Sequence, residues 1–199
     1  MSRIREIPRV SWTDAAPPGD GPAAEAALEA GAVLFLPQLA FAVAAAERDI
    51  FSPALLSSSK NASFDPSTNH VGGTSLTGEA RDGLGRVMAR FSAAAQSLVH
   101  ALLPSYRTAI VRARTSFRPA EIAGRQTSWR KDDTRLHVDA FPASPVQGRR
   151  IVRVFSNVNP EGRPRSWRIG HFGLHQPSDQ VGCGKRRERA LEDRSPPAR

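Results

Sequence analysis

The residues with the clearest chemical potential are His137 and Asp139, which are separated by one residue in the stretch RLHVDAF at 135–141. Apolar and polar residues alternate there, which predicts a β-strand with both side chains on the same face. One imidazole and one carboxylate are two of the three protein ligands of a facial Fe(II) site. The pattern therefore predicts an iron site at His137 and Asp139. The alternative is a polar pair on an exposed strand face, because a single H-x-D pattern also arises by chance.

The third iron ligand has no clear candidate in the sequence. His171 and His175 have a spacing that suits one side of a helix, but a glycine and a proline interrupt that segment. His70 falls in a predicted loop, and His100 falls near the end of a predicted helix, where a histidine can interact with the helix dipole. The identity of the third ligand stays open.

Arginine side chains share one face on each of two predicted strands, and they suit a negatively charged ligand if both faces line the cavity of His137. Alternation predicts these strands over 106–117 and 149–158. Guanidinium groups bind carboxylates and phosphates through paired hydrogen bonds. The candidate contacts to an acidic cosubstrate or substrate are Arg112, Arg114, Arg149, Arg153 and Asn157. The alternative is that these side chains belong to solvated strand faces.

The elements that position these residues change in type along the chain. Helical spacing predicts helices over 23–31, near 39–49 and over 77–102. The last of these has an apolar stripe formed by Leu84, Val87, Met88, Phe91, Leu98 and Leu102. A short buried strand is predicted over 32–36, Ser52 is a candidate helix cap, and the composition of 57–75 predicts a loop. Helices followed by strands indicate an α+β fold.

Composition restricts the class of protein. The 199 residues are 40% hydrophobic and 24% charged, which is ordinary for a globular protein. No apolar run reaches the length of a membrane span, and the charged N-terminus does not resemble a signal peptide. The single cysteine, Cys183, fits a reducing compartment.

The formal net charge of +9 leaves a second class of function open. A basic protein that binds nucleic acid or anionic lipid, without catalytic activity, is the alternative to an enzyme. The bias toward arginine over lysine, together with abundant alanine, glycine and proline, is also typical of a GC-rich genome. No recognition motif favours nucleic acid as the partner.

A long linear stretch carries a resemblance to a known family. Residues 127–170, TSWRKDDTRLHVDAFPASPVQGRRIVRVFSNVNPEGRPRSWRIG, resemble the Kdo hydroxylases, and so do KNASFDP at 60–66, GGTSLTG at 72–78 and YRTAIVRARTSFRP at 106–119. Members of this family are Fe(II)- and 2-oxoglutarate-dependent dioxygenases. They hydroxylate C3 of 3-deoxy-D-manno-oct-2-ulosonic acid (Kdo) in the inner core of lipopolysaccharide. The resemblance covers about residues 30–170.

The resemblance implies a fold, cofactors and partners. The fold would be a double-stranded β-helix, or jelly roll, with flanking N-terminal helices. His137 and Asp139 would bind Fe(II), 2-oxoglutarate would be the cosubstrate, and a Kdo-containing lipid or sugar would be the substrate. That substrate would place the protein in the cytoplasm, in peripheral contact with the anionic surface of the inner membrane, and the absence of a signal-peptide pattern agrees with this location.

The resemblance ends near Gly170, where the composition changes to an Arg-, Gly- and Pro-rich stretch typical of disordered tails. We expect a polar N-terminal segment at 1–22, a partial dioxygenase domain at 23–170 and an irregular tail at 171–199. The expectation is an incomplete jelly roll in a truncated or frameshifted chain that lacks the third iron ligand and is inactive. Unpaired strand edges in such a fold would favour aggregation.

Overall fold

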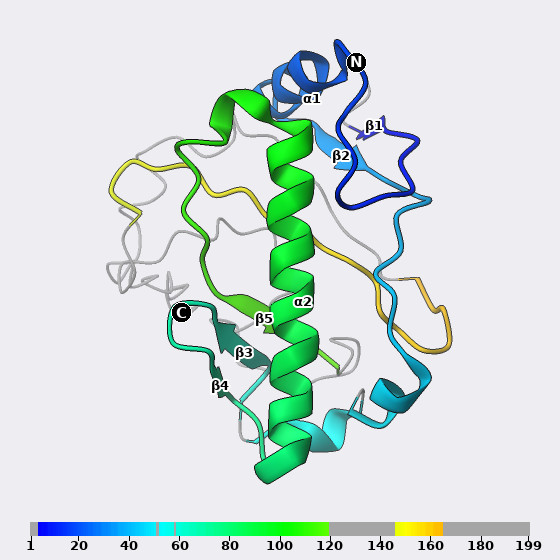
Figure 1. The fold of residues 1–199 in the computed structure, drawn as a ribbon, viewed down its shortest axis with the longest axis vertical. Coiled ribbons are helices and arrows are strands. Elements are labelled where there is room, and N and C mark those ends of the chain that lie inside the picture. Colours follow the sequence, from blue (N-terminus) through cyan, green and yellow to red (C-terminus); the bar gives the residue numbers. More distant parts are fainter. Residues whose placement is uncertain (1–3, 51, 58, 120–145, 165–199) are drawn as a thin grey trace, which may run out of the picture. The chain divides into compact units, whose positions relative to one another are not determined.

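A computed structural model of the chain describes residues 4–50, 52–57, 59–119 and 146–164. Within these residues the order of elements is β1 (Ile4–Glu6), α1 (Asp20–Glu29), β2 (Val33–Phe35), β3 (Ala62–Asp65), β4 (His70–Gly72), α2 (Gly78–Leu102) and β5 (Thr115–Phe117). Short 3-10 helices occupy Ala45–Ile50, Pro53–Leu55 and Pro104–Tyr106. In Figure 1, α1, β1 and β2 lie near the C-terminal end of α2, and β3, β4 and β5 lie near its N-terminal half.

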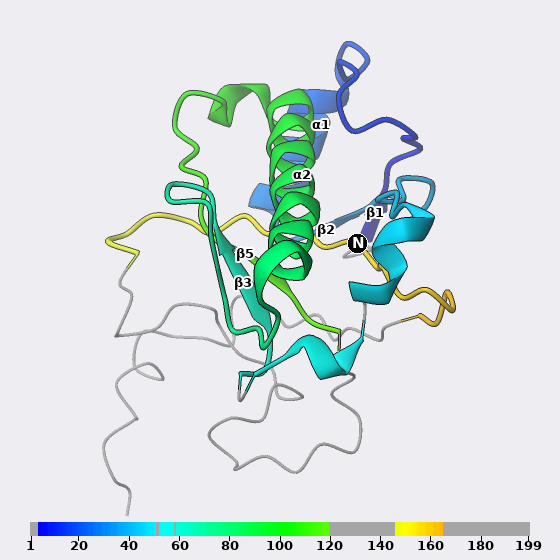
Figure 2. The same ribbon diagram turned by 60° about the horizontal axis from the view of Figure 1, so that its bottom comes forward.

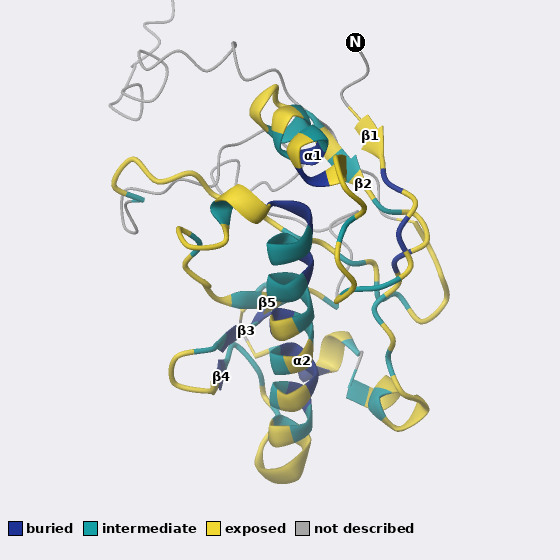
Figure 3. Ribbon diagram, turned by 45° about the horizontal axis from the view of Figure 1, so that its top comes forward, coloured by how far each residue is buried: buried dark blue, intermediate teal, exposed yellow. Residues whose placement is uncertain are grey.

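Helix α2 confirms the helix that was predicted over 77–102. Its apolar stripe is buried as expected at Leu84, Val87, Met88, Leu98 and Leu102, and Phe91 is half-buried. The buried stripe runs along the helix in Figure 3. Pro104 follows the last helical residue and begins a 3-10 turn, because proline has no N–H to continue the hydrogen-bond ladder.

A three-stranded antiparallel sheet packs against the N-terminal half of α2. Its strand order is β4-β3-β5, with Phe64 opposite both Val71 and Thr115. Ala62, Phe64 and Val71 are buried together with Leu84 and Met88 of the helix. Figure 2 shows this sheet on one side of α2 and the 3-10 helix Ala45–Ile50 on the other.

The prediction of a loop throughout 57–75 is wrong, because β3 and β4 form a hairpin there. Polar residues dominate the segment, but Ala62 and Phe64 alternate with Ser63 and Asp65 and give β3 one buried face. The turn between the strands holds the residues that suggested a loop. The Asp65 carboxylate accepts the Ser67 N–H at 3.0 Å, and Asn69 adopts a left-handed conformation with φ of 54°.

A second core lies at the C-terminal end of α2. Its buried residues are Ile7, Ala24, Leu39, Leu98, Leu102 and Leu103. Helix α1 and the parallel pair β1 and β2 cover it, with Ile4 opposite Val33 and Glu6 opposite Phe35. Residues 4–7, which lie in the predicted polar segment, therefore contribute a strand and a core side chain.

The predicted strand at 32–36 is confirmed as β2, but the prediction that it is buried is wrong. Val33 and Phe35 are 43% and 51% exposed, because only the opposite face of the strand, with Leu34, packs on the core. The predicted helix at 23–31 is α1, which starts three residues earlier at Asp20. Gly31 follows its C-terminus with φ of 80°, which fits its predicted role as a helix stop.

The prediction of a helix near 39–49 is wrong for most of that stretch. Only the 3-10 helix Ala45–Ile50 forms, and residues 40–44 have no regular secondary structure. Phe41 packs edge-to-face on Trp12 and on Phe91 of α2, a contact that holds this stretch by tertiary packing. The Trp12 indole N–H also donates to the Ala40 carbonyl at 3.1 Å. The predicted cap is confirmed, since the Ser52 hydroxyl accepts the Ala54 N–H at 3.2 Å.

Two of the predicted strands are shorter or absent in the described residues. The strand predicted over 106–117 is confirmed only at β5, and residues 149–158 contain no strand. A strand forms where its backbone pairs with a neighbouring strand. Of the described residues in these two segments, only Thr115–Phe117 pair with another strand, which is β3. The strand predicted over 135–141 lies outside the described residues. Among the described residues, no helix has the length and apolar character needed to span a membrane.

Candidate functional site

The predicted iron ligands His137 and Asp139 lie outside the described residues, as do His171 and His175. The described chain reaches position 119 just after β5 and resumes at position 146. Among the described residues, no group of three or more histidine, cysteine, aspartate or glutamate side chains is arranged to hold a metal ion. The described residues therefore flank the predicted ligand pair in the sequence.

The clearest polar contact at this part of the chain joins Arg114 to Asp65. Phe64 pairs with Thr115 at the end of the antiparallel ladder, and Asp65 and Arg114 are the residues directly beyond this last pair. The Arg114 Nε donates to Asp65 Oδ2 at 3.2 Å. The Arg114 side chain is 72% exposed, whereas that of Asp65 is 23% exposed. The arginine therefore extends from the sheet into solvent while its inner edge is held.

The Asp65 carboxylate stays ionised for a clear reason. Its other oxygen, Oδ1, accepts the Ser67 hydroxyl at 2.6 Å and the Ser67 N–H at 3.0 Å. These two hydrogen bonds, and after them the Arg114 guanidinium, lower the pKa of Asp65 below its ordinary value. Sequence reasoning did not select Asp65, although the FDPS stretch combines a strand-ending aspartate with a serine two residues later, which is a turn signal.

Arg112 precedes Arg114 by two residues and is also exposed. Both residues come before β5 begins at Thr115, so the strand argument that placed them on one face does not apply to them. Exposure of both guanidiniums near the start of one strand still makes this part of the surface basic.

The segment 149–158, which contains the other predicted anion contacts, is attached at the C-terminal end of α2. Val154 packs against the core at the C-terminal end of α2. The Arg150 guanidinium is paired with the Glu29 carboxylate at the end of α1. Arg149 and Arg153 are exposed on this segment. Their neighbours Ile151, Val152 and Phe155 are also exposed, at 45%, 46% and 60%.

Asn157 has a local structural role. Its side-chain oxygen accepts the Asn159 N–H at 3.1 Å, and its amide donates to the Arg163 carbonyl at 2.8 Å. Both polar groups of this side chain thus hold the 157–163 turn. Contact with an anionic ligand stays a prediction for Asn157.

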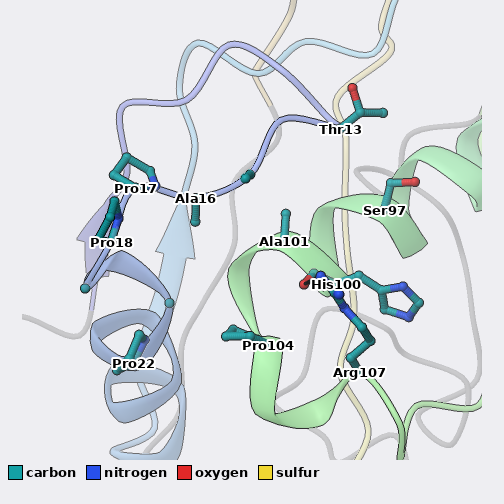
Figure 4. Close-up of a pocket in the computed structure, with 13 residues that line it drawn as sticks. Thr13, Ala16, Pro17, Pro18, Pro22, Ser97, His100, Ala101, Pro104 and Arg107 are labelled. Carbon is teal, nitrogen blue, oxygen red and sulfur yellow. Dashed lines mark hydrogen bonds between the residues drawn. The ribbon is translucent and has the colours of Figure 1, made fainter.

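Two open cavities lie beside α2. One, of about 610 Å³, is bordered by Thr13, the proline-rich 16–22 stretch and the end of the helix (Figure 4). His100 and Arg107 lie side by side at its edge, and the Arg107 guanidinium donates to the His100 carbonyl at 3.2 Å. The other, of about 660 Å³, lies between β4 and the start of α2, where Arg81 contacts His70 Nε2 at 3.1 Å. Neither cavity contains one of the predicted site residues.

Comparison with known proteins identifies the class. The family model of 3-deoxy-D-manno-oct-2-ulosonic acid (Kdo) hydroxylases matches residues 11–174. The chain belongs to the Kdo hydroxylase family, which confirms the resemblance found in the sequence. No curated protein matches the chain.

Solved structures of the Kdo hydroxylase KdoO are similar to this chain. The crystal structure in complex with cobalt(II) is 43% identical, has a TM-score of 0.79 and is matched over 82% of this chain and 55% of that one. The complex with α-ketoglutarate and Fe(III) is 42% identical with a TM-score of 0.77, over 81% and 54%. The apo structure is 43% identical, has a TM-score of 0.78 and is matched over 81% of this chain and 54% of that one. All three describe KdoO as a non-heme Fe(II) α-ketoglutarate-dependent dioxygenase. The chain spans about 55% of the length of these solved relatives.

Proposed function

We propose that this protein takes part in Fe(II)- and 2-oxoglutarate-dependent hydroxylation of Kdo. The observation that carries the proposal is the family match over residues 11–174, together with 43% identity and a TM-score of 0.79 to the solved Kdo hydroxylase. Identity at this level over four fifths of the chain supports a shared site as well as a shared fold. It also favours completion of the small sheets as part of a jelly roll, with residues 23–170 as the dioxygenase domain.

His137 and Asp139 are the residues we propose to hold the iron. An imidazole and a carboxylate are ligands that suit Fe(II), and their H-x-D spacing lies within the part of the chain that matches the family. When bound, iron and 2-oxoglutarate would supply the oxidising chemistry that inserts oxygen into a C–H bond. The protein would hold the two ligands, bind the acidic cosubstrate and substrate through arginines, and exclude water.

Arg112, Arg114, Arg149 and Arg153 are the proposed anion contacts. Arg114 has the best support among them, because a cross-strand carboxylate fixes its inner edge and leaves the guanidinium directed to solvent. A Kdo-containing partner and a cytoplasmic location at the anionic inner-membrane surface are part of the same proposal. The family's substrate supports both.

A product assay tests this proposal. The protein is incubated with Fe(II), 2-oxoglutarate, oxygen and a Kdo-containing lipid, and mass spectrometry follows succinate and the gain of one oxygen atom on the sugar. The proposed function predicts both products, in contrast to the inactivity expected from the sequence, and it predicts that His137→Ala abolishes them. His100→Ala, which removes a histidine of α2 that is not among the proposed site residues, is the matched control and should retain them. Iron binding without either product would contradict the proposed activity and support the expectation of an inactive chain.

A further inference from the structure

The guanidinium of Arg114 has two edges with different surroundings, because Asp65 binds only one of them. Asp65 binds it through Nε, on the inner side. Among the contacts of the described residues, Arg114 uses Nε alone, and 72% of its side chain is exposed to solvent. A guanidinium whose terminal edge is open can bind a carboxylate with two parallel hydrogen bonds.

We propose that Asp65 is a positioning residue, which holds Arg114 by Nε so that the terminal nitrogens of Arg114 bind a carboxylate of the ligand. Asp65 is well placed for this role because its own position is fixed. It is the last residue of β3, and Ser67 holds its Oδ1 through two hydrogen bonds while Oδ2 is directed at Arg114. Each carboxylate oxygen therefore has a separate function.

The electrostatics fit a carboxylate ligand. Hydrogen bonds from Ser67 keep the pKa of Asp65 low, so the carboxylate remains charged and keeps its hold on the arginine. Arg112, exposed two residues earlier, adds a second positive charge to the same stretch. A side chain held in one orientation loses less conformational entropy when it binds a ligand than a free arginine does.

The choice of ligand rests on the proposed function. A sugar acid such as Kdo and a 2-oxo diacid such as 2-oxoglutarate both have a carboxylate, and this shared group is what Arg114 would bind. Separate titrations with each compound distinguish the two sources.

The sequence offers a precise pair of variants. Asp65→Asn keeps an oxygen for the two Ser67 hydrogen bonds but places an NH2 group, which cannot accept a hydrogen bond, against Arg114. Ser67→Ala does the reverse, because it removes the hydroxyl from Oδ1 and leaves the contact to Arg114 intact. Arg107→Ala removes one positive charge from the end of α2 and controls for general electrostatic attraction.

Isothermal titration at low ionic strength, anaerobically and with Fe(II) present, would measure the Kd of Kdo and of 2-oxoglutarate for each protein. We expect Arg114→Ala to raise the Kd of one of the two ligands by at least about tenfold, as loss of a charge-assisted pair of hydrogen bonds would. Asp65→Asn should raise the same Kd by about threefold to tenfold. Ser67→Ala should raise it by less than Asp65→Asn does, because the N–H of residue 67 still binds Oδ1 and the contact to Arg114 remains. Arg107→Ala should leave it within about twofold, since Arg107 is not part of the contact.

Three outcomes would overturn the inference. They are equal effects of Asp65→Asn and Ser67→Ala, unchanged affinity for both ligands in Arg114→Ala, and no binding of either ligand by the unmodified protein. A thermal unfolding midpoint for each variant shows whether a lost affinity reflects lost structure. Affinity that depends on Arg114 and Asp65 in a protein that forms no product would contradict the proposed function and leave this inference standing.

Discussion

The two ends of α2 are stabilised in different ways. At the N-terminal half, a three-stranded antiparallel sheet packs Phe64 and Val71 onto Leu84 and Met88. At the C-terminal end, a two-stranded parallel pair and α1 cover a second apolar core, and polar contacts join the parts. Glu25 accepts the Ser105 N–H and hydroxyl, each at 2.8 Å, and Glu29 binds both the Tyr106 hydroxyl and Arg150.

This difference separates the predicted anion contacts into two groups. Arg114 depends on the sheet at the N-terminal half, through Asp65. Arg149 and Arg153 depend on the C-terminal end, because Val154 and Arg150 attach their segment to the core and to α1. Stability changes at one end should therefore affect one group of arginines more than the other.

The largest effect is expected from truncation of the core at either end. Leu84 is 1% exposed and Leu103 is 2% exposed, so replacement of either by alanine leaves a cavity. Each change should lower the free energy of unfolding by about 2–5 kcal/mol, measured by chemical denaturation. Hydrogen exchange should then show faster exchange in β3 for Leu84→Ala and in α1 for Leu103→Ala. Equal acceleration at both ends in both variants would show that the two cores act as one.

A smaller effect is expected from a pair of glycines with positive φ. Gly73 has φ of 73°, and an added Cβ would lie 2.4 Å from the Asn61 carbonyl oxygen. Gly31 has φ of 80°, but an added Cβ would meet no atom within 4 Å. Gly31→Ala should lower the free energy of unfolding by about 1–2 kcal/mol through backbone strain alone. Gly73→Ala should lower it further, and a smaller effect than that of Gly31→Ala would contradict the hairpin geometry.

Loss of a polar contact at the C-terminal end should have a modest effect. Tyr106→Phe removes the hydroxyl that donates to Glu29 and keeps the ring in the core. The free energy of unfolding should fall by about 1 kcal/mol, and hydrogen exchange near Val154 should accelerate, because Glu29 also holds Arg150. An unchanged exchange rate there would show that the segment is held by apolar packing alone.

The smallest effect is expected at the ion pair between Glu47 and Arg90. Both carboxylate oxygens of Glu47 accept from the guanidinium at 2.8 Å, and the hydrogen bond from Arg90 is the main reason why the pKa of Glu47 lies below 4.5. Glu47→Gln should lower the free energy of unfolding by about 0.5–1 kcal/mol at neutral pH. Glu79→Gln, which breaks a more exposed pair with Arg86, is the control and should have less effect.

The same pair predicts a pH dependence with a defined sign. A carboxylate with a lowered pKa in the folded state stabilises the protein fully above its ordinary pKa of 4.5. That contribution is lost as the pH falls below 4.5 through the folded pKa. The difference in stability between the unmodified protein and Glu47→Gln should therefore be constant above about pH 5 and shrink below it. A difference that persists in acid would contradict the ion pair.

The sequence is sufficient to predict an element whose apolar pattern lies within one continuous segment. Helix α2 needs only a continuous apolar stripe, and its bounds were predicted within one residue at its start. Strands β3 and β4 were missed because their polar turn residues outnumber the two buried side chains of β3. The extent of a strand at 106–117 or 149–158 depends on which segment pairs with it, and that information is distant in the sequence.

The candidate site was predicted in part. Arg114 was selected for its charge and alternation, and the structure adds its partner Asp65, 49 positions away in the sequence. Alternation alone cannot identify such a cross-strand partner, because it depends on the register between β3 and β5. His137 and Asp139 stay predictions that rest on the H-x-D spacing and on the family match.

The most direct test of the account is an anaerobic titration of the purified protein with Fe(II), with and without 2-oxoglutarate. We predict that iron binds and that a metal-to-ligand absorption band appears only when 2-oxoglutarate is added. His137→Ala and Asp139→Ala should lose this band, and His100→Ala, a histidine at the end of α2, should retain it. A band that is absent from the unmodified protein, or that survives both ligand substitutions, would contradict an iron site at His137 and Asp139.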